Sequence, residues 1–312
     1  MTRERPHISV IICTYNRSAL LERALRAFRD QAPAPSAEIV VVDNNSSDDT
    51  AEVTRRYAEN LRAIVPVIYV HEPTQGLSRA RNAGIEAARG EILAFLDDDA
   101  VPSPGWLAAV ADVFSAHPDA AAAGGPIEPE FEIPRPDWLG PALEGYYSIL
   151  DLGPETRAFP RKHIPFGANM ALRRTSLGDL RFSEALGRKG ASLESDEERA
   201  LFRQLRADGG QIVYAPPMRV RHFVPRERLS VDWLLARSAG GGVSRARLAK
   251  GPLQRLALLV RIVLAYAVTE GAHVLGMERD PLLRRCRKAH YATICRTLFA
   301  RGPSEPTAPE RQ

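Results

Sequence analysis

The sequence has few cysteines, and their spacing predicts neither disulfide bonds nor a metal site. Three occur in 312 residues, Cys13, Cys286 and Cys295, and none shows CxxC or metal-ligand spacing. An odd number of widely spaced cysteines argues against a disulfide framework, so we expect a reduced, cytosolic protein. The apolar run Ile8–Cys13 is too short for a signal-peptide core and has no small-residue cleavage site after it, which predicts a first strand instead.

Glycine-rich nucleotide loops are also missing. No GxGxxG follows the first apolar run, and no GxxxxGK[ST] occurs in the chain. These absences argue against a dinucleotide-binding fold and against a P-loop. The remaining composition is ordinary for a globular protein, with 45% hydrophobic residues, 26% charged residues and a net charge of +4. The length suits one large domain with an extension, and we expect no nucleic-acid partner.

Apolar runs alternate with segments of helical period over the first hundred residues. Strands are predicted at residues 8–13, 39–42, 65–72 and 91–99. Helices are predicted at 18–31 with Ser18 as N-cap, from Asp48 or Asp49 onward, and at 77–90. Strands that alternate with helices imply βαβ units, so the fold class is α/β with a mostly parallel central sheet flanked by helices.

Three consecutive aspartates, Asp97, Asp98 and Asp99, follow the apolar run Ile92–Leu96. Adjacent carboxylates repel by about 1 kcal/mol at 4 Å in water and by roughly 4 kcal/mol at an effective dielectric of 20. A solvated turn would tolerate such a cluster. A buried strand, however, would bring it to the carboxyl edge of the sheet, where α/β proteins bind ligands, and a divalent cation there would bridge carboxylates to a diphosphate.

Polar side chains also follow the first two strands. Thr14, Tyr15 and Asn16 follow one strand, and Asp43 follows the next with two asparagines behind it. At one edge of a parallel sheet these groups would converge on a pocket. Asp43 alone would fit an N-cap or an Asx-turn nearly as well. The functional interpretation therefore depends on acidic or amide side chains following each of three successive strands.

Five segments in order, "SVIICTYNR", "VVDNNSSDDT", "GLSRARNAGIEAARGEILAFLDDDAVPSPGWL", "PFGANMALRR" and "EERALFRQLRADGGQIVYAPPMRVRH", resemble glycosyltransferase family 2, whose members have the GT-A fold. The resemblance spans roughly Ile8 to His222. Cys13 stands where the family usually has proline. The family's reaction is inverting sugar transfer from a nucleotide-diphosphate sugar with a divalent metal, Mn²⁺ or Mg²⁺, which suits polysaccharide or glycolipid assembly in the cell envelope.

The resemblance assigns roles to the donor side. Asp97 and Asp99 match the DXD motif that binds metal and diphosphate, His222 matches a histidine that reaches the same metal or diphosphate, and Asp98 is expected on the sugar or ribose side. The positions that match nucleotide-binding residues of the family are Thr14, Tyr15, Asn16, Asp43 and Arg81.

The base that deprotonates the acceptor belongs to an "ED" pair in the family, and Glu197 and Glu198 match that pair. We favour Glu198, then Glu197, with Asp196 one residue earlier as a further candidate. A structural alternative is a capping box in which Ser195 and Glu198 cap the start of a helix. His222 likewise has an alternative as an ordinary core or surface histidine.

Three further residues are expected near the sugars. Gly167 and Asn169 lie in the segment that the family places against acceptor and donor sugar, although they also suit a turn before a strand. Trp106 is a candidate stacking platform, and aromatic residues of this kind more often belong to the core.

The family signal ends near residue 225, which predicts a catalytic domain at 1–225, a helical extension at 226–302 and a disordered tail at 303–312. Arg261 and Glu270 interrupt the apolar stretch Leu256–Gly276, each costing roughly 2.5 to 3.5 kcal/mol near the centre of a membrane helix. Residues 251–302 carry nine Lys and Arg against three Asp and Glu. This charge predicts peripheral contact with anionic lipid on the inner face of the cell membrane, and a solvated helical face is the alternative.

Two other functional classes remain open from the sequence: a non-catalytic nucleotide-sugar-binding protein of the same fold, and a metal-dependent nucleotidyltransferase. The acidic pair Glu197 and Glu198 favours catalysis over binding alone. The absence of a glycine-rich basic loop after the first strand disfavours nucleotidyl transfer. The acceptor is expected to be a carbohydrate or a lipid-linked glycan.

Overall fold

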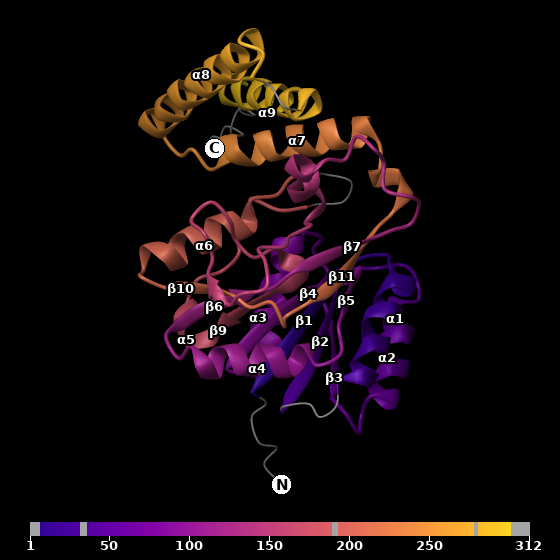
Figure 1. Cartoon of the computed structure of the whole chain (residues 1–312). Coiled ribbons are helices and arrows are strands. Elements are labelled where there is room, and N and C mark those ends of the chain that lie inside the picture. Colours follow the sequence, from indigo (N-terminus) through magenta and orange to yellow (C-terminus); the bar gives the residue numbers. More distant parts are fainter. Residues whose placement is uncertain (1–6, 32–35, 189–192, 278–279, 301–312) are drawn as a thin grey trace, which may run out of the picture.

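The computed structural model describes residues 7–31, 36–188, 193–277 and 280–300. Its centre is an eight-stranded sheet in the order β3-β2-β1-β4-β9-β6-β10-β8, with helices on both sides (Figure 1). The first four strands run parallel, as the sequence predicted. They are β1 (Ile8–Thr14), β2 (Ala37–Asp43), β3 (Val67–His71) and β4 (Ile92–Asp97). Strands β1, β2 and β4 are buried along almost their whole length, which explains their continuous Val and Ile runs.

The crossover helices lie close to their predicted positions. They are α1 (Ser18–Arg26), continued by the short η1 (Ala27–Asp30), then α2 (Thr50–Asn60) and α3 (Leu77–Ala87). Ser18 is the first residue of α1 rather than its N-cap, and its N–H donates to the Asp48 carboxylate. Helix α3 ends earlier than predicted because the N–H groups of Arg89 and Gly90 donate to Glu38 and Ser9 instead of continuing the helix.

The second half of the sheet is mixed. Strand β9 (Met170–Arg173) runs antiparallel to both β4 and β6, while β10 runs parallel to β6. The other elements of this half are β6 (Ala120–Gly124), β8 (Arg157–Ala158), β10 (Gln211–Tyr214), α4 (Trp106–Ala116), α5 (Arg174–Leu177) and α6 (Glu197–Ala207). Short 3₁₀ turns η2 (Pro141–Tyr147) and η3 (Gly167–Asn169) connect them.

A second, three-stranded sheet follows directly from the aspartate cluster. It contains β5 (Ala100–Pro102), β11 (Val220–Val224) and β7 (Ile127–Phe131), with β11 in the middle. The register pairs His222 with Ala100, and the Phe223 N–H donates to the Asp99 carbonyl at 2.8 Å. This small sheet therefore brings a distant histidine beside the aspartates.

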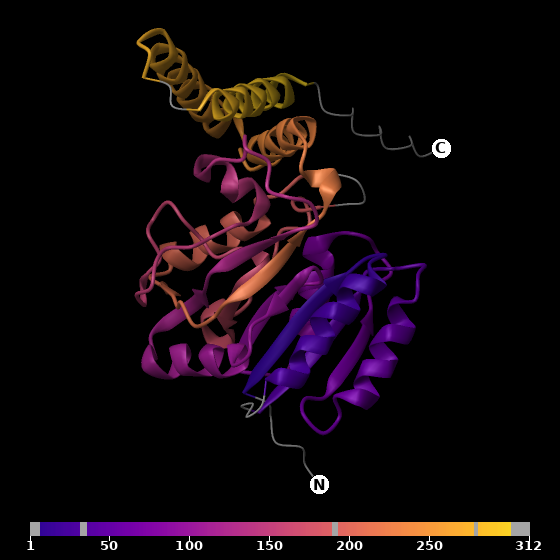
Figure 2. The same ribbon diagram turned by 45° about the vertical axis from the view of Figure 1, so that its right-hand side comes forward.

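Three C-terminal helices form a layer above the large sheet (Figures 1 and 2). They are α7 (Val231–Arg247), which follows η4 (Arg226–Arg228), α8 (Pro252–Val274) and α9 (Pro281–Phe299). Helix α7 packs against η2 and α9 through a separate apolar cluster that includes Leu143, Tyr147, Leu234 and Cys286. The C-terminal helices therefore rest on the remainder of the described chain through an apolar cluster of their own.

Three consecutive glycines, Gly240, Gly241 and Gly242, lie inside α7, where each costs about 1 kcal/mol relative to alanine. Close packing explains two of them. A Cβ on Gly242 would lie 2.6 Å from the His290 carbonyl oxygen of α9, and one on Gly240 would lie 2.5 Å from the Leu193 carbonyl oxygen. The glycines thus let α9 and the segment before α6 approach the α7 backbone.

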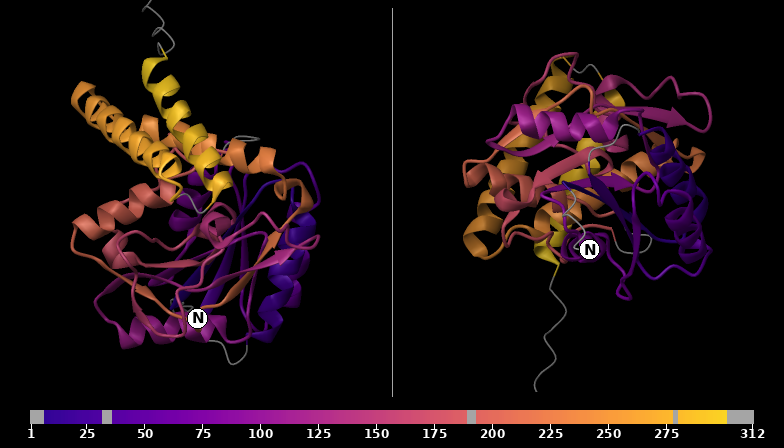
Figure 3. Two further views of the ribbon diagram at one scale, coloured as in Figure 1. Left: turned by 45° about the horizontal axis from the view of Figure 1, so that its top comes forward. Right: turned by 90° about the horizontal axis from the view of Figure 1, so that it is seen from below.

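Helix α8 lies beside α9 at the outer end of the molecule (Figure 3). It is long and apolar enough to cross a membrane by length and composition, and only 11% of its most apolar window is buried. Its exposed large side chains include Leu253, Leu256, Val260, Val263 and Leu264. One such helix is weak evidence for a span, so membrane contact remains a prediction. The predicted tail at 303–312 lies outside the described residues.

Candidate active site

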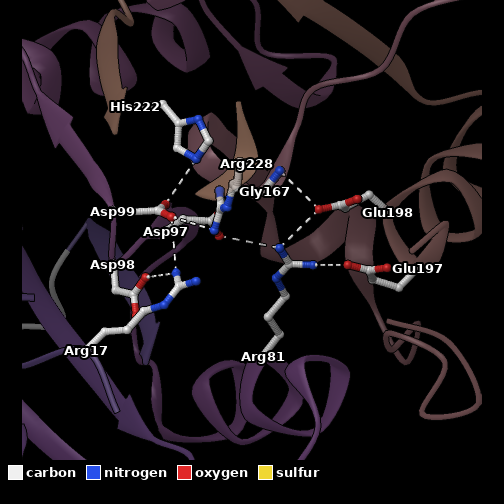
Figure 4. Close-up of polar contacts among 10 residues, drawn as sticks. All are labelled: Arg17, Arg81, Asp97, Asp98, Asp99, Gly167, Glu197, Glu198, His222 and Arg228. Atoms are coloured by element: carbon white, nitrogen blue, oxygen red, sulfur yellow. Dashed lines mark hydrogen bonds and ion pairs between the residues drawn. The ribbon is translucent and has the colours of Figure 1, made fainter. Parts of the chain in front are cut away.

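A cavity of about 970 Å³ lies between the carboxyl ends of the parallel strands and the C-terminal helices. Its lining comes from the loops after β1 and β4, the start of α6, and all three of α7, α8 and α9. We call the strand end of this cavity its floor and the end formed by α7, α8 and α9 its roof. Figure 4 shows the polar contacts of the floor.

Asp98 points toward the first strand rather than into open space. Its carboxylate accepts hydrogen bonds from the Thr14 hydroxyl at 2.8 Å and from Arg17 Nη1 at 3.0 Å (Figure 4). Burial raises the pKa of Asp98 to about 6, against the opposing charge of Arg17. Asp98 therefore joins two segments of the floor and also lines the cavity, so its contact with the sugar or ribose stays a prediction.

Asp99 is the most heavily paired of the three aspartates. Its oxygens lie 3.1 Å from His222 Nε2, 3.1 Å from Arg17 Nη1 and 3.4 Å from Arg228 Nη2. Burial opposes its ionisation, but His222 and the two arginines outweigh that cost and hold the pKa of Asp99 well below its usual range. Asp99 is therefore a carboxylate at neutral pH.

Asp97, Asp99 and His222 together fit a divalent cation. One ligand atom from each lies within 4.8 Å of the others. The buried His222 Nδ1 has no hydrogen-bond partner among the described residues. Two carboxylates with an imidazole are a donor set that Mn²⁺ and Mg²⁺ accept. The predicted metal ligands thus converge, with His222 supplied by β11.

Arg81 links this group to the two glutamates. The buried guanidinium contacts Glu197 Oε1 at 2.9 Å, Glu198 Oε1 at 3.0 Å and, at 3.6 Å, Asp97 Oδ1. Glu198 Oε1 also accepts the Gly167 N–H at 3.2 Å. A Cβ on Gly167 would lie 1.9 Å from Arg81 Nη2, so only glycine leaves room for this arrangement.

The capping box that would have explained Ser195 and Glu198 structurally does not form. Helix α6 begins at Glu197, and its N-cap, Asp196, has a left-handed backbone with φ of 78° and makes no side-chain cap. The Ser195 hydroxyl accepts from Arg237 instead, and the Glu198 carboxylate faces Arg81 and Gly167. The Glu198 carboxylate therefore contacts groups that line the cavity and does not cap the helix.

The three candidate bases differ in surroundings. The Glu197 side chain is 4% exposed and that of Glu198 is 16% exposed. Burial, followed by the neighbouring Glu198 charge, raises the pKa of Glu197 to about 7 despite Arg81. Glu197 Oε2 has no hydrogen-bond partner among the described residues. Asp196 pairs with Arg199 at 3.2 Å. Of the two glutamates that pair with Arg81, Glu198 is therefore the more accessible.

Two predicted contacts with sugar are wrong. Trp106 is fully buried in the core, where its ring packs on Phe28, and its Nε1–H donates to Asn169 Oδ1 at 3.0 Å. Asn169 is also fully buried and donates to the carbonyls of Pro126 and Met218. Neither side chain lines the cavity. An indole whose N–H is satisfied internally has no free face for a sugar, so both residues position neighbouring strands.

The predicted nucleotide residues divide into two groups. Thr14 and Tyr15 line the cavity, and Tyr15 is 38% exposed. Asp43 accepts from Tyr69 Oη at 2.8 Å and from the Ser46 N–H, and Asn16 bonds the Ser46–Ser47 turn. Asp43 and Asn16 are not among the lining residues, and both hold the turn at Ser46 and Ser47, so their contact with the nucleotide stays a prediction.

Sequence reasoning missed two arginines of the floor. Arg17 directly follows "CTYN", and its position after the first strand is the sequence feature that could have indicated its place beside the aspartates. Arg228 follows β11 after a short turn in "PRERLS", a basic surface-like pattern with no indication that it returns to Asp99. Both supply positive charge beside the aspartate cluster.

The glycosyl transferase family 2 model matches residues 9–181. Among relatives, the succinoglycan biosynthesis protein ExoM of Rhizobium meliloti is 30% identical over 80% of this chain and 77% of its own length. The glucosyl-dolichyl phosphate glucuronosyltransferase of Haloferax volcanii is 27% identical over 76% of each chain.

The fold has relatives among solved structures. The mannosyltransferase PcManGT of Pyrobaculum calidifontis, solved with GDP-Man and Mn²⁺, superimposes with a TM-score of 0.62 at 22% identity, over 95% of this chain and 88% of that one. This likeness supports the GT-A fold. Together with the matching family model and the relatives, it leads to one conclusion: the chain belongs to glycosyltransferase family 2 and is a glycosyltransferase.

Proposed function

We propose that this protein is an inverting, metal-dependent transferase that moves a sugar from a nucleotide-diphosphate sugar to an acceptor hydroxyl. One observation carries the proposal: a single cavity holds a cation-binding group, Asp97, Asp99 and His222, and a separate carboxylate, Glu198, with Arg81 in contact with both. The solved relative that binds GDP-Man and Mn²⁺ has the same fold and supports this donor class.

On the donor side, Asp97, Asp99 and His222 would hold Mn²⁺ or Mg²⁺. Such an ion neutralises the diphosphate of the donor and stabilises charge on the leaving phosphate. Arg17 and Arg228 add positive charge at Asp99. Thr14 and Tyr15 contact the nucleoside from the cavity wall, while Asn16 and Asp43 hold the turn at Ser46 and Ser47.

On the acceptor side, Glu198 takes the proton of the attacking hydroxyl. The Gly167 N–H and Arg81 hold its Oε1, which leaves Oε2 to face the acceptor. A hydroxyl activated here attacks the anomeric carbon opposite the leaving diphosphate, and a single in-line displacement inverts the configuration. Glu197, more deeply buried, supports Arg81 and is the second candidate, followed by Asp196.

The relatives and α8 support an acceptor class and a cellular location. The names of two relatives refer to succinoglycan biosynthesis and to a dolichyl phosphate glycolipid, which supports a role in polysaccharide or glycolipid assembly. The exposed apolar side of α8 and the basic extension suit the cytoplasmic face of an anionic membrane.

The test is turnover of a panel of nucleotide sugars by the full-length protein, with and without chelator. At least one donor should show metal-dependent transfer or slow hydrolysis that chelator abolishes. Glu198→Gln should then lose on the order of 10²- to 10⁴-fold in kcat with donor affinity retained. Glu197→Gln is the control, and a loss confined to it would reverse the order of preference.

Donor binding without any turnover would favour a non-catalytic nucleotide-sugar-binding protein. Release of diphosphate from nucleoside triphosphates would favour a nucleotidyltransferase. A full rate in chelator would contradict the metal-dependent mechanism.

A further inference from the structure

Five arginines surround the roof end of the cavity, and we call them the roof arginines. They come from four separate segments. Arg188 lies in the loop before α6, Arg237 and Arg245 in α7, Arg261 in α8 and Arg287 in α9. Within the described residues, none of the five forms an ion pair with a carboxylate. Two carboxylates that line the cavity near these arginines are Glu194 and Asp196. They pair with Arg247 and Arg199, which are not roof arginines.

Arg237 is the most constrained of the roof arginines. Its Nη1 donates to the Leu193 carbonyl at 3.0 Å and to the Ser195 hydroxyl at 2.9 Å, both neutral acceptors. Its buried Nε has no partner in the part of the chain that the structure describes. Burial and the nearby charge of Arg188 lower the pKa of Arg237. The charges of Glu197, Glu198 and Asp196 oppose this shift, but none of them forms an ion pair with Arg237 among the described residues. An anion bound directly to the guanidinium would offset the remaining cost of its burial.

Apolar side chains lie at the same end. Leu258, Ile262 and Ala265 of α8 line the cavity beside Arg261. The outer side of the same helix exposes Leu256, Val260, Val263 and Leu264. The roof thus combines arginines and apolar side chains that line the same cavity, and the opposite side of α8 is also apolar.

We propose that the roof arginines bind the phosphate or diphosphate that joins the acceptor glycan to an apolar chain, and that Leu258 and Ile262 contact the start of that chain. This inference rests on the proposed function, because it assigns the acceptor class of the same cavity. A neutral carbohydrate acceptor would leave five positive charges without an ion-pair partner among the described residues. Guanidinium groups match phosphate oxygens in paired geometry, so arginine is the suitable residue for this role.

The position relative to the base agrees with this assignment. Arg237 bonds Ser195, two residues before Glu197, so the anion site begins next to the candidate base and extends away from the floor. The donor diphosphate has its own cations at Asp99, namely Arg17 and Arg228. An acceptor whose phosphate lies at the roof would therefore present its sugar hydroxyl toward Glu198.

The test measures binding of farnesyl diphosphate to the full-length protein by titration calorimetry, in chelator and without nucleotide. The variant Arg261→Gln/Arg287→Gln removes one exposed roof arginine each from α8 and α9. The matched control, Arg255→Gln/Arg285→Gln, removes the same charge from exposed positions of the same helices that do not line the cavity. We expect the first pair to weaken binding on the order of tenfold or more and the control pair to change it little.

Two comparison ligands separate the sources of binding. Inorganic diphosphate should bind more weakly than farnesyl diphosphate because it lacks the apolar chain, and farnesol should bind more weakly because it lacks the charge. Equal affinity for inorganic diphosphate would overturn the lipid assignment. Equal loss in the two variant pairs, or wild-type affinity in the first pair, would overturn the site itself.

The outcome is independent of donor chemistry, since neither metal nor nucleotide is present. Intact farnesyl diphosphate binding with no turnover of any nucleotide sugar would contradict the proposed function alone. Metal-dependent transfer with no farnesyl diphosphate binding would contradict this inference alone.

Discussion

The floor and the roof of the cavity handle charge in opposite ways. At the floor, Asp98 and Asp99 pair with Arg17, and Arg81 pairs with Glu197 and Glu198. At the roof, arginines from four segments meet without an acidic partner among the described residues. Compensated charges hold one another in place before any ligand arrives. In the part of the chain that the structure describes, the roof arginines lack such pairing, and Arg237 is held only by neutral acceptors, so a bound anion would supply the missing ion pairs.

The largest effect is expected from the floor. Asp99→Asn removes one proposed metal ligand and leaves Arg17, Arg228 and His222 without their shared carboxylate. Transfer should fall on the order of 10²- to 10³-fold or more, because the charge of the leaving phosphate is no longer stabilised. The rise in melting temperature that Mn²⁺ gives to wild type should disappear. An Mn²⁺-dependent rise that survives in Asp99→Asn would show that the cation binds elsewhere.

A smaller effect concerns pH and Glu197. Its pKa is about 7 in the folded protein, above the ordinary glutamate value of 4.5, so the folded state holds this proton more tightly. The stabilisation from that proton is complete below about pH 4.5 and is lost as pH rises through about 7. Glu197→Gln lacks this titration. Its free energy of unfolding should therefore increase relative to wild type between pH 5 and 8, as urea titrations would measure.

A difference between the two proteins that stays constant over this range would mean that Glu197 is ionised throughout. In that case Arg81 would be fully paired with two carboxylates, and the floor would be more completely compensated than the pKa of Glu197 implies.

The smallest effect is expected at the outer side of the roof. Full-length protein should bind vesicles that contain phosphatidylglycerol more tightly than vesicles of phosphatidylcholine, with partial release at high salt, because the extension is basic. Leu256→Ser/Val263→Ser should weaken binding several-fold, since both side chains are exposed on α8. No binding to either vesicle would favour a helical cap without membrane contact.

The sequence predicted the parallel half of the fold well because each strand is a short apolar run that ends in polar residues. The convergence of Asp97 and Asp99 with the Glu197–Glu198 pair followed from the family motifs. Trp106 and Asn169 were misassigned because a sequence does not show that an indole N–H will find its partner sixty residues away. The same holds for Ser195 and Glu198, whose spacing fits a capping box that tertiary contacts override.

The roof could not be predicted from local pattern. Its arginines are separated by up to a hundred residues, and each one read separately looks like a solvated charge on a helix or loop. They meet because Gly240 and Gly242 let α7 lie against neighbouring backbone, a packing relation that glycine content alone does not specify.

The small sheet has a consequence for protein engineering. His222 lies in β11, and α7 begins only nine residues later at Val231, with Arg228 between them. A chimera that exchanges the C-terminal helices to change acceptor choice would, if joined before β11, also replace His222, the proposed metal ligand, and Arg228. A junction placed between Arg228 and Val231 would keep the donor half of the enzyme intact and transplant only the helices that form the roof.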